Sequence, residues 1–329
     1  MIDVSVMKTK VAIIIPNWNG QDMLKNCISC LLSQSVSAQV VVVDNGSKDN
    51  SVSRVKEFPG VKLLEFKDNA GFAGGVNRGI KYALTEGFVY IGLFNNDAIA
   101  DKDWLDKLIK NIEDSDEIGI STGKLMRSDR KHIDSTGDFY TIWGIPFPRG
   151  RNQVDSGQYD KKELVFGATG GASLYRSELF RDIGMFDEDF FAYYEDVDIS
   201  FRAQMAGWKV AYTPDAVAYH GVGGTSSKMG DFTRFHSAKN FLLLYARNMP
   251  TKLYFKYGLF FSIQFLRYFA SSILRGKPLP FIKGSLAAIK LHSKTRAIRK
   301  HNLSKQRVSN KYIDNLLIHS RPPRIPPIE

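Results

Sequence analysis

The sequence predicts an α/β protein in which a doubly wound, mostly parallel sheet is followed by a basic helical extension. Short β-branched runs alternate with segments whose apolar residues recur at helical spacing. This alternation is typical of parallel sheets that carry helices on both faces. The formal net charge of +11 is also uneven, because residues 246–329 carry +15 and the preceding residues carry −4. The charge therefore separates a mildly acidic globular part from a basic end.

The first hundred residues show the alternation most clearly. Strands are predicted over 10–16, 39–43, 61–66 and 89–94, and helices over 22–34, 51–57 and 76–84, with a glycine-rich loop over 69–77. The two cysteines, Cys27 and Cys30, fall three residues apart in the first helix, where they fit its buried face. A redox or zinc motif is the alternative, but zinc needs two more ligands.

The middle of the chain is less regular. A helix is predicted over 104–113, a strand over 118–126, a strand over 165–175 and a helix over 177–183. A further helix is expected to end at residue 206, before strands over 207–212 and 217–220. The stretch 129–160 is polar and rich in Gly and Pro, which is typical of a lid or an acceptor loop. We expect one unit over 1–245, made of the halves 10–100 and 101–245.

Residues 246–329 are interpreted as amphipathic helices. The segment 252–274 is apolar and aromatic, but Lys256, Gln264 and Arg267 interrupt it, so it is a poor membrane-spanning helix. The segment 290–307 is dense in Lys and Arg. Such helices favour an anionic membrane surface, and nucleic acid is the rival partner. Residues 1–10 do not resemble a signal peptide, and the Pro-rich 321–329 is expected to be disordered.

An acid cluster over 193–202 places Glu195, Asp196 and Asp198 within four positions and ends with Arg202. Aromatic and apolar residues surround the acids. Carboxylates buried together are unfavourable unless a cation, a metal or a proton relieves them. A purely structural interpretation is a helix N-terminus in which Arg202 pairs with Asp198 one turn away. A catalytic cluster is the other interpretation.

Polar clusters follow four predicted strands, at 17–20, 44–47, 69–77 and 95–97. Parallel strands bind ligands at their carboxyl ends, so these clusters indicate a nucleotide-sized site. Neither a P-loop nor a true dinucleotide fingerprint is present. Asp97 is either a turn residue or a ligand for Mg²⁺ or Mn²⁺ beside phosphates. His220, at a strand end, is either structural or a second ligand of that metal.

Taken together, these motifs resemble family 2 glycosyltransferases with a GT-A fold, especially the rhamnosyltransferase-like branch. The resemblance covers about residues 10–225 in order. The matching pieces are I-I-I-P-N-W-N-G (13–20), V-V-D-N-G-S-K-D-N-S (42–51), N-A-G-F-A-G-G-V-N-R-G (69–79), F-N-N-D (94–97), G-A-T-G-G-A-S-L-Y-R (167–176), G-M-F-D-E-D-F-F-A-Y-Y-E-D-V-D-I-S-F-R (184–202) and A-Y-H-G-V-G-G-T (218–225).

The resemblance implies a role for each matching residue. It places Asp196 as general base, with Glu195 and Asp198 beside it, and Asp97 and His220 as ligands of Mg²⁺ or Mn²⁺. Asn replaces the usual acids at positions 95 and 96. The residues implied to bind the nucleotide sugar are Pro16, Asn17, Asn19, Asp44, Asn45, Asn69, Gly71, Gly74, Asn77, Arg78, Asn95, Asn96 and Gly171.

The function implied is inverting transfer of a sugar from a nucleotide sugar to a hydroxyl of a glycan acceptor, in cell-surface polysaccharide synthesis. The best guess for the donor is dTDP-L-rhamnose, with UDP-sugars left open. A polyprenyl-diphosphate-linked acceptor fits the basic extension, and the expected location is the cytoplasmic face of the membrane. The alternative is a catalytically inactive nucleotide-sugar or glycan-binding protein. A nucleic-acid partner is disfavoured because residues 1–245 are acidic overall.

Overall fold

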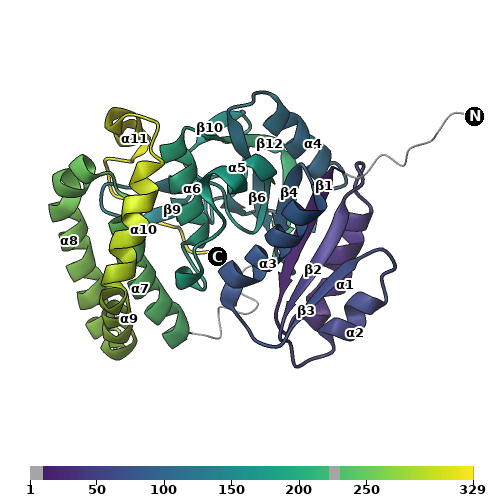
Figure 1. The fold of residues 1–329 in the computed structure, drawn as a ribbon, viewed down its shortest axis with the longest axis horizontal. Coiled ribbons are helices and arrows are strands. Elements are labelled where there is room, and N and C mark those ends of the chain that lie inside the picture. The colour runs from purple at the N-terminus through teal and green to yellow at the C-terminus, as the bar shows by residue number, and fades with distance from the viewer. Residues whose placement is uncertain (1–9, 222–229, 329) are drawn as a thin grey trace, which may run out of the picture.

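The computed structural model describes residues 10–221 and 230–328, and its centre is a ten-stranded sheet with helices on both faces (Figure 1). The strands are β1 (Val11–Asn17), β2 (Gln39–Asn45), β3 (Lys62–Phe66), β4 (Tyr90–Phe94), β5 (Ala98–Ala100), β6 (Ile118–Arg127), β7 (Ile133–Ser135), β8 (Asp138–Tyr140), β9 (Pro146–Pro148), β10 (Glu163–Val165), β11 (Ala172–Arg176) and β12 (Lys209–His220). The helices are α1 (Gln21–Leu32), α2 (Ser51–Lys56), α3 (Gly71–Glu86), α4 (Trp104–Glu113), α5 (Ser177–Ile183), the 3₁₀ helix η1 (Glu188–Phe190), α6 (Glu195–Ala206), α7 (Gly230–Asn248), α8 (Thr251–Leu274), α9 (Pro278–Lys290), α10 (His292–Ser304) and α11 (Asn310–Leu316).

The main path of the sheet runs β10-β12-β6-β11-β4-β1-β2-β3. The strands β4, β1, β2 and β3 are parallel, as predicted, and β11 lies antiparallel between β4 and β6. The chain moves outward from β1 to β3 and then returns to place β4 on the other side of β1. This reversal is a topological switch point, where open α/β sheets bind ligands beyond the strand carboxyl ends.

Apolar side chains form a core on each face of the sheet, because the central strands are hydrophobic on both sides. One core contains Leu24 of α1 and Trp104 of α4, and the other contains Val76 of α3 and Ile199 of α6. Cys27 is buried and Cys30 partly buried on α1, as the structural interpretation of the pair predicts.

Three predicted element boundaries differ from the structure. The glycine-rich stretch is not a loop before a helix, because α3 already begins at Gly71. The expected strand over 165–175 is two strands, β10 and β11, since Gly167 leaves the sheet to exchange two backbone hydrogen bonds with Asp138. The two last strands are a single strand, β12, with a register shift between Thr213 and Val217, where Pro214 cannot donate to the ladder.

The stretch 129–160 is more ordered than a lid or loop. It contributes β7, which pairs with β6, and the hairpin of β8 and β9. Asp134, Ser135, Thr136 and Asp138 are buried there. The pattern escaped detection because each strand is only three residues long, too short to show a period.

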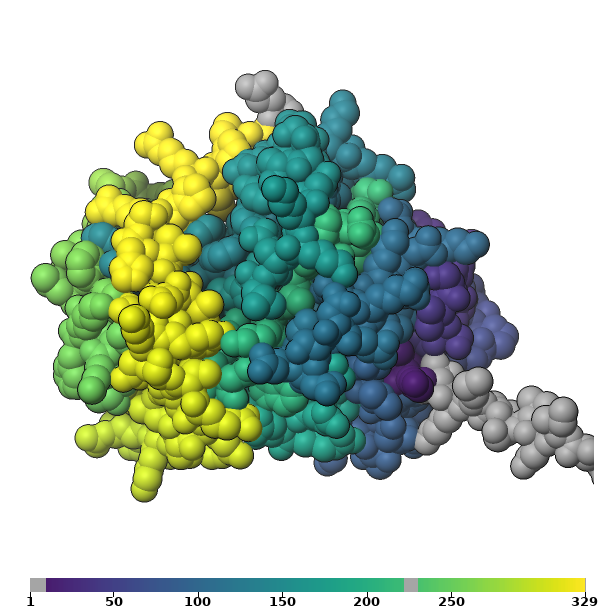
Figure 2. Space-filling model, turned by 90° about the horizontal axis from the view of Figure 1, so that it is seen from above, coloured from purple at the N-terminus to yellow at the C-terminus, as the bar shows by residue number. Residues whose placement is uncertain are grey.

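The C-terminal helices pack against α6 through a third apolar cluster, which includes Phe201 of α6, Leu244 of α7 and Ile313 of α11. Figure 2 shows the yellow C-terminal residues lying against the teal middle of the chain. The boundary expected at residue 245 falls inside α7. No helix in the described part of the chain is long and apolar enough to cross a membrane. Residues 321–328 adopt neither helix nor strand.

Candidate active site

A hydrogen-bonded polar cradle lies at the carboxyl ends of β1 and β2. Asn17, which faces Asp44 across the two strands, donates to Asp44 Oδ1 (3.1 Å) and Ser47 Oγ (3.2 Å). Its own Oδ1 accepts from Asn96 Nδ2 (2.8 Å), so residues from three strand ends are joined. A side chain at Gly20 would lie 2.2 Å from Asn96 Nδ2. The structure thus brings together Asn17, Asp44 and Asn96, as the resemblance implied.

Asn19 and Pro16 line the same edge. Asn19 has a positive φ of 52°, which Asn tolerates better than most residues, and its Oδ1 accepts from the Lys48 backbone N–H (2.7 Å). Its own backbone N–H donates to Ser47 Oγ (2.9 Å). Pro16 lies beside Gly75 of α3, so α3 packs closely over the end of β1.

Asn45, Asn69 and Arg78 hold the start of α3 against β2. Asn45 Nδ2 donates to the Gly71 carbonyl (2.8 Å), and Asn45 Oδ1 accepts from Arg78 (3.0 Å). Asn69 Oδ1 accepts from the Gly71 N–H (2.8 Å). The Arg78 guanidinium also stacks 3.9 Å above the Phe66 ring. These side chains position the glycine-rich start of α3. A ligand could approach the backbone there, because the glycines carry no side chains.

Asn77 and the glycines of α3 contact the segment that precedes the acid cluster, a role that the sequence did not predict. Asn77 is buried and exchanges hydrogen bonds with the backbone of Phe186, and it also donates to Glu188 Oε1 (2.9 Å). A side chain at Gly71 would lie 2.3 Å from the Phe191 carbonyl, and one at Gly74 would meet Ala70. The prediction that Asn77 binds the nucleotide sugar does not fit this position. Asn77 instead joins the nucleotide half to the segment before the acid cluster.

Asp97 and His220 are adjacent, as expected for two ligands of one metal. His220 Nε2 lies 3.0 Å from Asp97 Oδ1, and His220 Nδ1 lies 2.9 Å from Asp134 Oδ2. Asn95 Nδ2 is 3.0 Å from the same Nε2. Burial disfavours the charged imidazole, yet hydrogen bonds to Asp134 and Asp97 raise the pKa of His220 to about 9. In the protonated imidazolium, Nδ1–H donates to Asp134 and Nε2–H donates to Asp97.

These residues fit a divalent cation. When a cation displaces the Nε2 proton, Asp134 keeps the remaining proton on Nδ1, and the Nε2 lone pair is then free to bind that cation beside Asp97, the usual arrangement of a histidine ligand and its supporting carboxylate. Within residues 10–221 and 230–328 no group of three His, Cys, Asp or Glu side chains is placed to hold a metal ion. Asp97 and His220 would therefore need substrate oxygens and water to complete six ligands, which Mg²⁺ and Mn²⁺ accept.

The acid cluster begins α6, and a strained turn precedes it. Phe191, Tyr193 and Tyr194 all have positive φ, between 63° and 72°, where L-residues other than Gly and Asn are rare. Asn240 of α7 is fully buried and donates to the carbonyls of Phe190, Ala192 and Tyr193 at 2.7–2.9 Å. The C-terminal helices thus hold the turn in a conformation that its sequence disfavours.

Asp196 is the partly exposed acid of the cluster. Its Oδ2 accepts from the Gly170 N–H (3.1 Å) and its Oδ1 from the Val197 N–H (2.9 Å). Burial raises the pKa of Asp196 above its ordinary value, although the hydrogen bond from Gly170 opposes the shift. The next residue, Gly171, accepts from the Asn95 N–H (2.9 Å). The Gly170–Gly171 turn therefore contacts both the candidate base and the candidate metal motif.

Glu195 and Asp198 do not share the exposure of Asp196. Asp198 is 1% exposed, and its carboxylate accepts from Arg202 Nε (2.9 Å) and Asn248 Nδ2 (2.7 Å). The helix-pair interpretation is thus confirmed for Arg202 and Asp198, and it assigns Asp198 to positioning. Glu195 is 6% exposed, and burial and Asp196 raise its pKa well above the ordinary value. The raised pKa favours the neutral form of Glu195, which repels an ionised Asp196 less than a second carboxylate would.

Sequence reasoning missed three charged residues, all from the stretch 129–160. Besides Asp134, Arg151 pairs with Asp134 Oδ1 (2.9 Å). Asp138 is buried and accepts from Ser135 Oγ (3.0 Å), and burial and the nearby Asp196 raise the pKa of Asp138 to about 7. The run D-S-T-G-D at 134–138 was a usable signal, because two acids and two hydroxyls gather there.

Comparison with known proteins places this geometry in a family. The profile described as Glycosyl transferase family 2 matches residues 12–184, more than half of the chain. The dTDP-rhamnosyl transferase RfbF of Shigella flexneri is 26% identical over 260 residues, which cover 75% of this chain and 84% of that protein. The poly-beta-1,6-N-acetyl-D-glucosamine synthase of Staphylococcus aureus (strain MSSA476) is 22% identical over 64% of this chain. The chain spans 49% of that synthase, about half its length.

Solved structures show the same fold at low identity. The mannosyltransferase PcManGT from Pyrobaculum calidifontis, in complex with GDP-Man and Mn²⁺, has a TM-score of 0.54 at 17% identity, covering 90% of this chain and 85% of that one. TarS 1–349 of S. aureus, in complex with UDP, has a TM-score of 0.55 at 15% identity, covering 90% and 88%. The expected fold class, a GT-A type α/β sheet with a helical C-terminal part, is confirmed. The chain belongs to glycosyl transferase family 2.

Proposed function

We propose that this protein transfers a sugar from a nucleotide sugar to a hydroxyl of a glycan acceptor, with inversion and with Asp196 as general base. The observation that carries the proposal is the Gly170–Gly171 turn, which bonds Asp196 on one side and Asn95 on the other. A base and a diphosphate-binding motif held by one rigid turn suit a single displacement. In such a reaction the acceptor attacks from the side opposite the leaving group.

In the proposed reaction one bond forms, one proton moves and one bond breaks. The acceptor oxygen bonds to the anomeric carbon, its proton passes to Asp196, and the bond from that carbon to the diphosphate oxygen breaks. A divalent cation on Asp97 and His220 would stabilise the charge that develops on the departing diphosphate. Asn17, Asp44 and Asn96 hold the nucleoside, and Asp44 is placed to accept from a base imide N–H.

The best candidate for the donor is dTDP-L-rhamnose, supported by the similarity to RfbF over most of both chains. The relatives named above use or bind different nucleotides, and UDP-sugars therefore belong in the same test. The replacement of acids by Asn95 and Asn96 favours a second candidate, a binding protein without turnover. Polysaccharide synthesis is the process we infer, since one of the relatives is a poly-beta-1,6-N-acetyl-D-glucosamine synthase.

The test is a panel of nucleotide sugars with Mn²⁺ or Mg²⁺, read by thermal stabilisation and by release of the nucleoside diphosphate. We expect stabilisation and release with at least one donor. Asp196→Asn should keep the stabilisation and abolish the release. Retained turnover in this variant would refute the assignment of the base, and stabilisation without release in the wild type would favour the binding protein.

We also infer that residues 246–329 bind the cytoplasmic face of an anionic membrane. The support is charge and exposed apolar surface: this segment carries +15, and leucines on α8 and α9 face solvent. The large exposed apolar residues of the two helices are Phe255, Leu259, Ile263, Leu266, Ile273, Leu274, Leu279, Ile282, Leu286 and Ile289. From Phe255 to Leu266 and from Leu279 to Ile289 they recur every three or four residues, as on one face of an interfacial helix.

Liposome flotation tests the membrane proposal. Truncation near residue 246 would cut α7 and remove packing around Leu244, so substitution is the cleaner change. Leu259→Glu with Leu266→Glu, at residues 69% and 61% exposed, should reduce flotation without altering the unfolding midpoint. Leu164→Glu is the control, because Leu164 is 58% exposed on β10, outside the extension. Equal flotation of both variants would contradict the proposal.

A further inference from the structure

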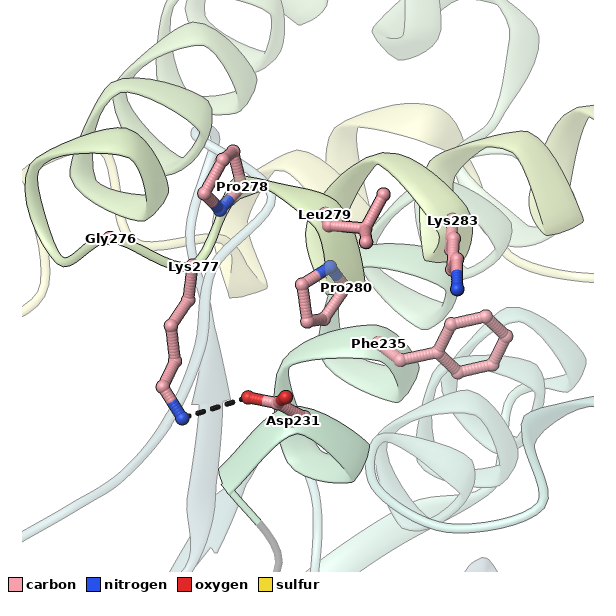
Figure 3. A pocket seen from close by; sticks show the side chains of 8 residues that line it. All are labelled: Asp231, Phe235, Gly276, Lys277, Pro278, Leu279, Pro280 and Lys283. Carbon is pink, nitrogen blue, oxygen red and sulfur yellow. Dashed lines mark hydrogen bonds and ion pairs between the residues drawn. The ribbon is translucent and has the colours of Figure 1, made fainter.

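Two pockets lie where α7 meets the turn between α8 and α9. The first, of about 470 Å³, is shown in Figure 3, and its Lys277 is paired with Asp231 at 2.8 Å. The second, of about 330 Å³, lies between α7, the end of α8, Phe281 of α9 and Tyr194. The two differ in charge, because an acid lines the first pocket and none lines the second.

The second pocket is cationic and rich in hydroxyls. Arg234 and Arg275 line it together with Thr233, Ser237 and Ser271. No described carboxylate lines the pocket, and among the described residues the buried Nε of Arg234 has no hydrogen-bond partner. A buried guanidinium donor without a partner is costly unless a ligand completes it. Guanidinium forks with hydroxyl donors are the groups that bind phosphate oxygens.

The pocket also touches the segment that carries the candidate base. Tyr194 lines it and immediately precedes Glu195 and Asp196. On the same wall the Tyr193 hydroxyl hydrogen-bonds to Thr233 Oγ1 (3.0 Å). The opposite wall belongs to α8 and α9, the two helices whose other faces expose the leucines. The pocket thus lies between the acid cluster and the surface inferred to meet the membrane.

We propose that this pocket binds the phosphate or diphosphate group of a lipid, and that the lipid is the carrier of the glycan acceptor. This inference rests on the proposed transferase function, and it adds a site for the acceptor's anion. The volume of the second pocket is at the lower limit of small-molecule pockets, which suits a diphosphate rather than a whole sugar chain. A bound phosphate beside Tyr194 would bring the attached sugar toward Asp196.

The experiment compares two double variants of the full chain. Arg234→Gln with Arg275→Gln removes both cations of the pocket. Arg267→Gln with Arg296→Gln removes the same charge from exposed positions on α8 and α10, outside the pocket. Binding is measured by flotation with phosphatidylcholine vesicles that contain a polyprenyl phosphate, with vesicles that contain phosphatidylglycerol, and by thermal shift with inorganic pyrophosphate.

We expect the pocket variant to bind polyprenyl-phosphate vesicles more weakly than the control variant, by roughly tenfold for each guanidinium lost. An equal deficit on phosphatidylglycerol vesicles would support the same phosphate chemistry with bulk lipid as its source, and a deficit with pyrophosphate alone would support a free anion. Equal behaviour of the two variants with all three probes overturns the proposal. The vesicle assays contain no nucleotide sugar, so they stand whether or not the donor panel succeeds. Loss of donor stabilisation in the pocket variant would overturn it too, by assigning the arginines to the donor site.

Discussion

Asn240→Ala should lower the rate of sugar transfer more than its loss of stability explains, because it changes the geometry of the acid cluster. Asn240 Nδ2 donates to the carbonyls of Phe190 (2.9 Å), Ala192 (2.8 Å) and Tyr193 (2.7 Å). One amide has two hydrogens, so three carbonyls share two donors. Alanine removes both donors, so at least the buried Phe190 carbonyl loses a hydrogen bond.

The expected loss of stability depends on two opposing contributions, the strain of the turn and the hydrogen bonds from Asn240 that hold it. Three residues at positive φ in the turn cost of order 1–3 kcal/mol each, about 3–9 kcal/mol together, and the packing around them must offset this strain. Loss of the clamp should lower the free energy of unfolding by about 2–4 kcal/mol. The strained turn, rather than the whole domain, should then relax, and a shift of about 1 Å in Asp196 costs roughly 100-fold in turnover.

The assay measures kcat for sugar transfer and the free energy of unfolding in urea for the same preparations. The matched control is Asn111→Ala, since Asn111 is also buried and donates to Ser121 Oγ (2.9 Å) and the Ala211 carbonyl (3.1 Å), away from the acid cluster. We expect similar losses of stability and a loss of kcat only for Asn240→Ala. Equal kcat values for the two variants would refute the role of the clamp.

Three further predictions follow from the buried charges. Asp198→Asn leaves Arg202 buried without its anion and should lower the free energy of unfolding by about 3–5 kcal/mol in a urea titration; an unchanged midpoint would contradict the assignment to positioning. Asp134→Asn removes the carboxylate that orients His220 and should weaken Mn²⁺ binding by about 10–100-fold in calorimetry, whereas equal affinity would show that Asp134 does not support the ligand. Burial lowers the pKa of His236 to about 4, so the unfolded chain takes up a proton below about pH 6.5 and the folded chain only near pH 4. Stability should therefore fall as the pH drops through this window, by at most about 3 kcal/mol, and His236→Gln should flatten that part of the pH profile.

The sheet was predictable because its strands carry continuous apolar runs. Burial on both faces gives the segments 10–16 and 39–43 a continuous apolar pattern that fits only a central strand, and the observed strands β1 and β2 contain residues 11–16 and 39–43. Prediction failed where structure depends on contacts distant in sequence. β7 pairs with β6 and Gly167 pairs with Asp138, and no local period announces either contact. The helix α7 was hidden for a related reason, since its buried face carries polar residues such as Asn240.

The candidate site shows the same division between local and distant contacts. The strand pattern predicted the polar clusters that contain Asn17, Asp44 and Asn96, because parallel strands bring their carboxyl ends to one edge, and the resemblance to the family then selected these residues. It could not rank the acids, since exposure depends on which face of α6 the C-terminal helices cover. Asn248 of α7 binds Asp198, and this contact assigns Asp198 to structure.

The C-terminal helices therefore belong to the candidate active site and are not an appendage to it. Asn240 holds the turn before Asp196, Asn248 fixes Asp198, and the fully buried Arg247 pairs with Asp187 and Asp189 just before the same turn. All three side chains come from one helix, α7, which also lines the cationic pocket. A change in how α8 and α9 lie on a membrane would thus reach the acid cluster through α7. The proposed membrane contact of α8 and α9 would then be coupled to the geometry of Asp196 by packing alone.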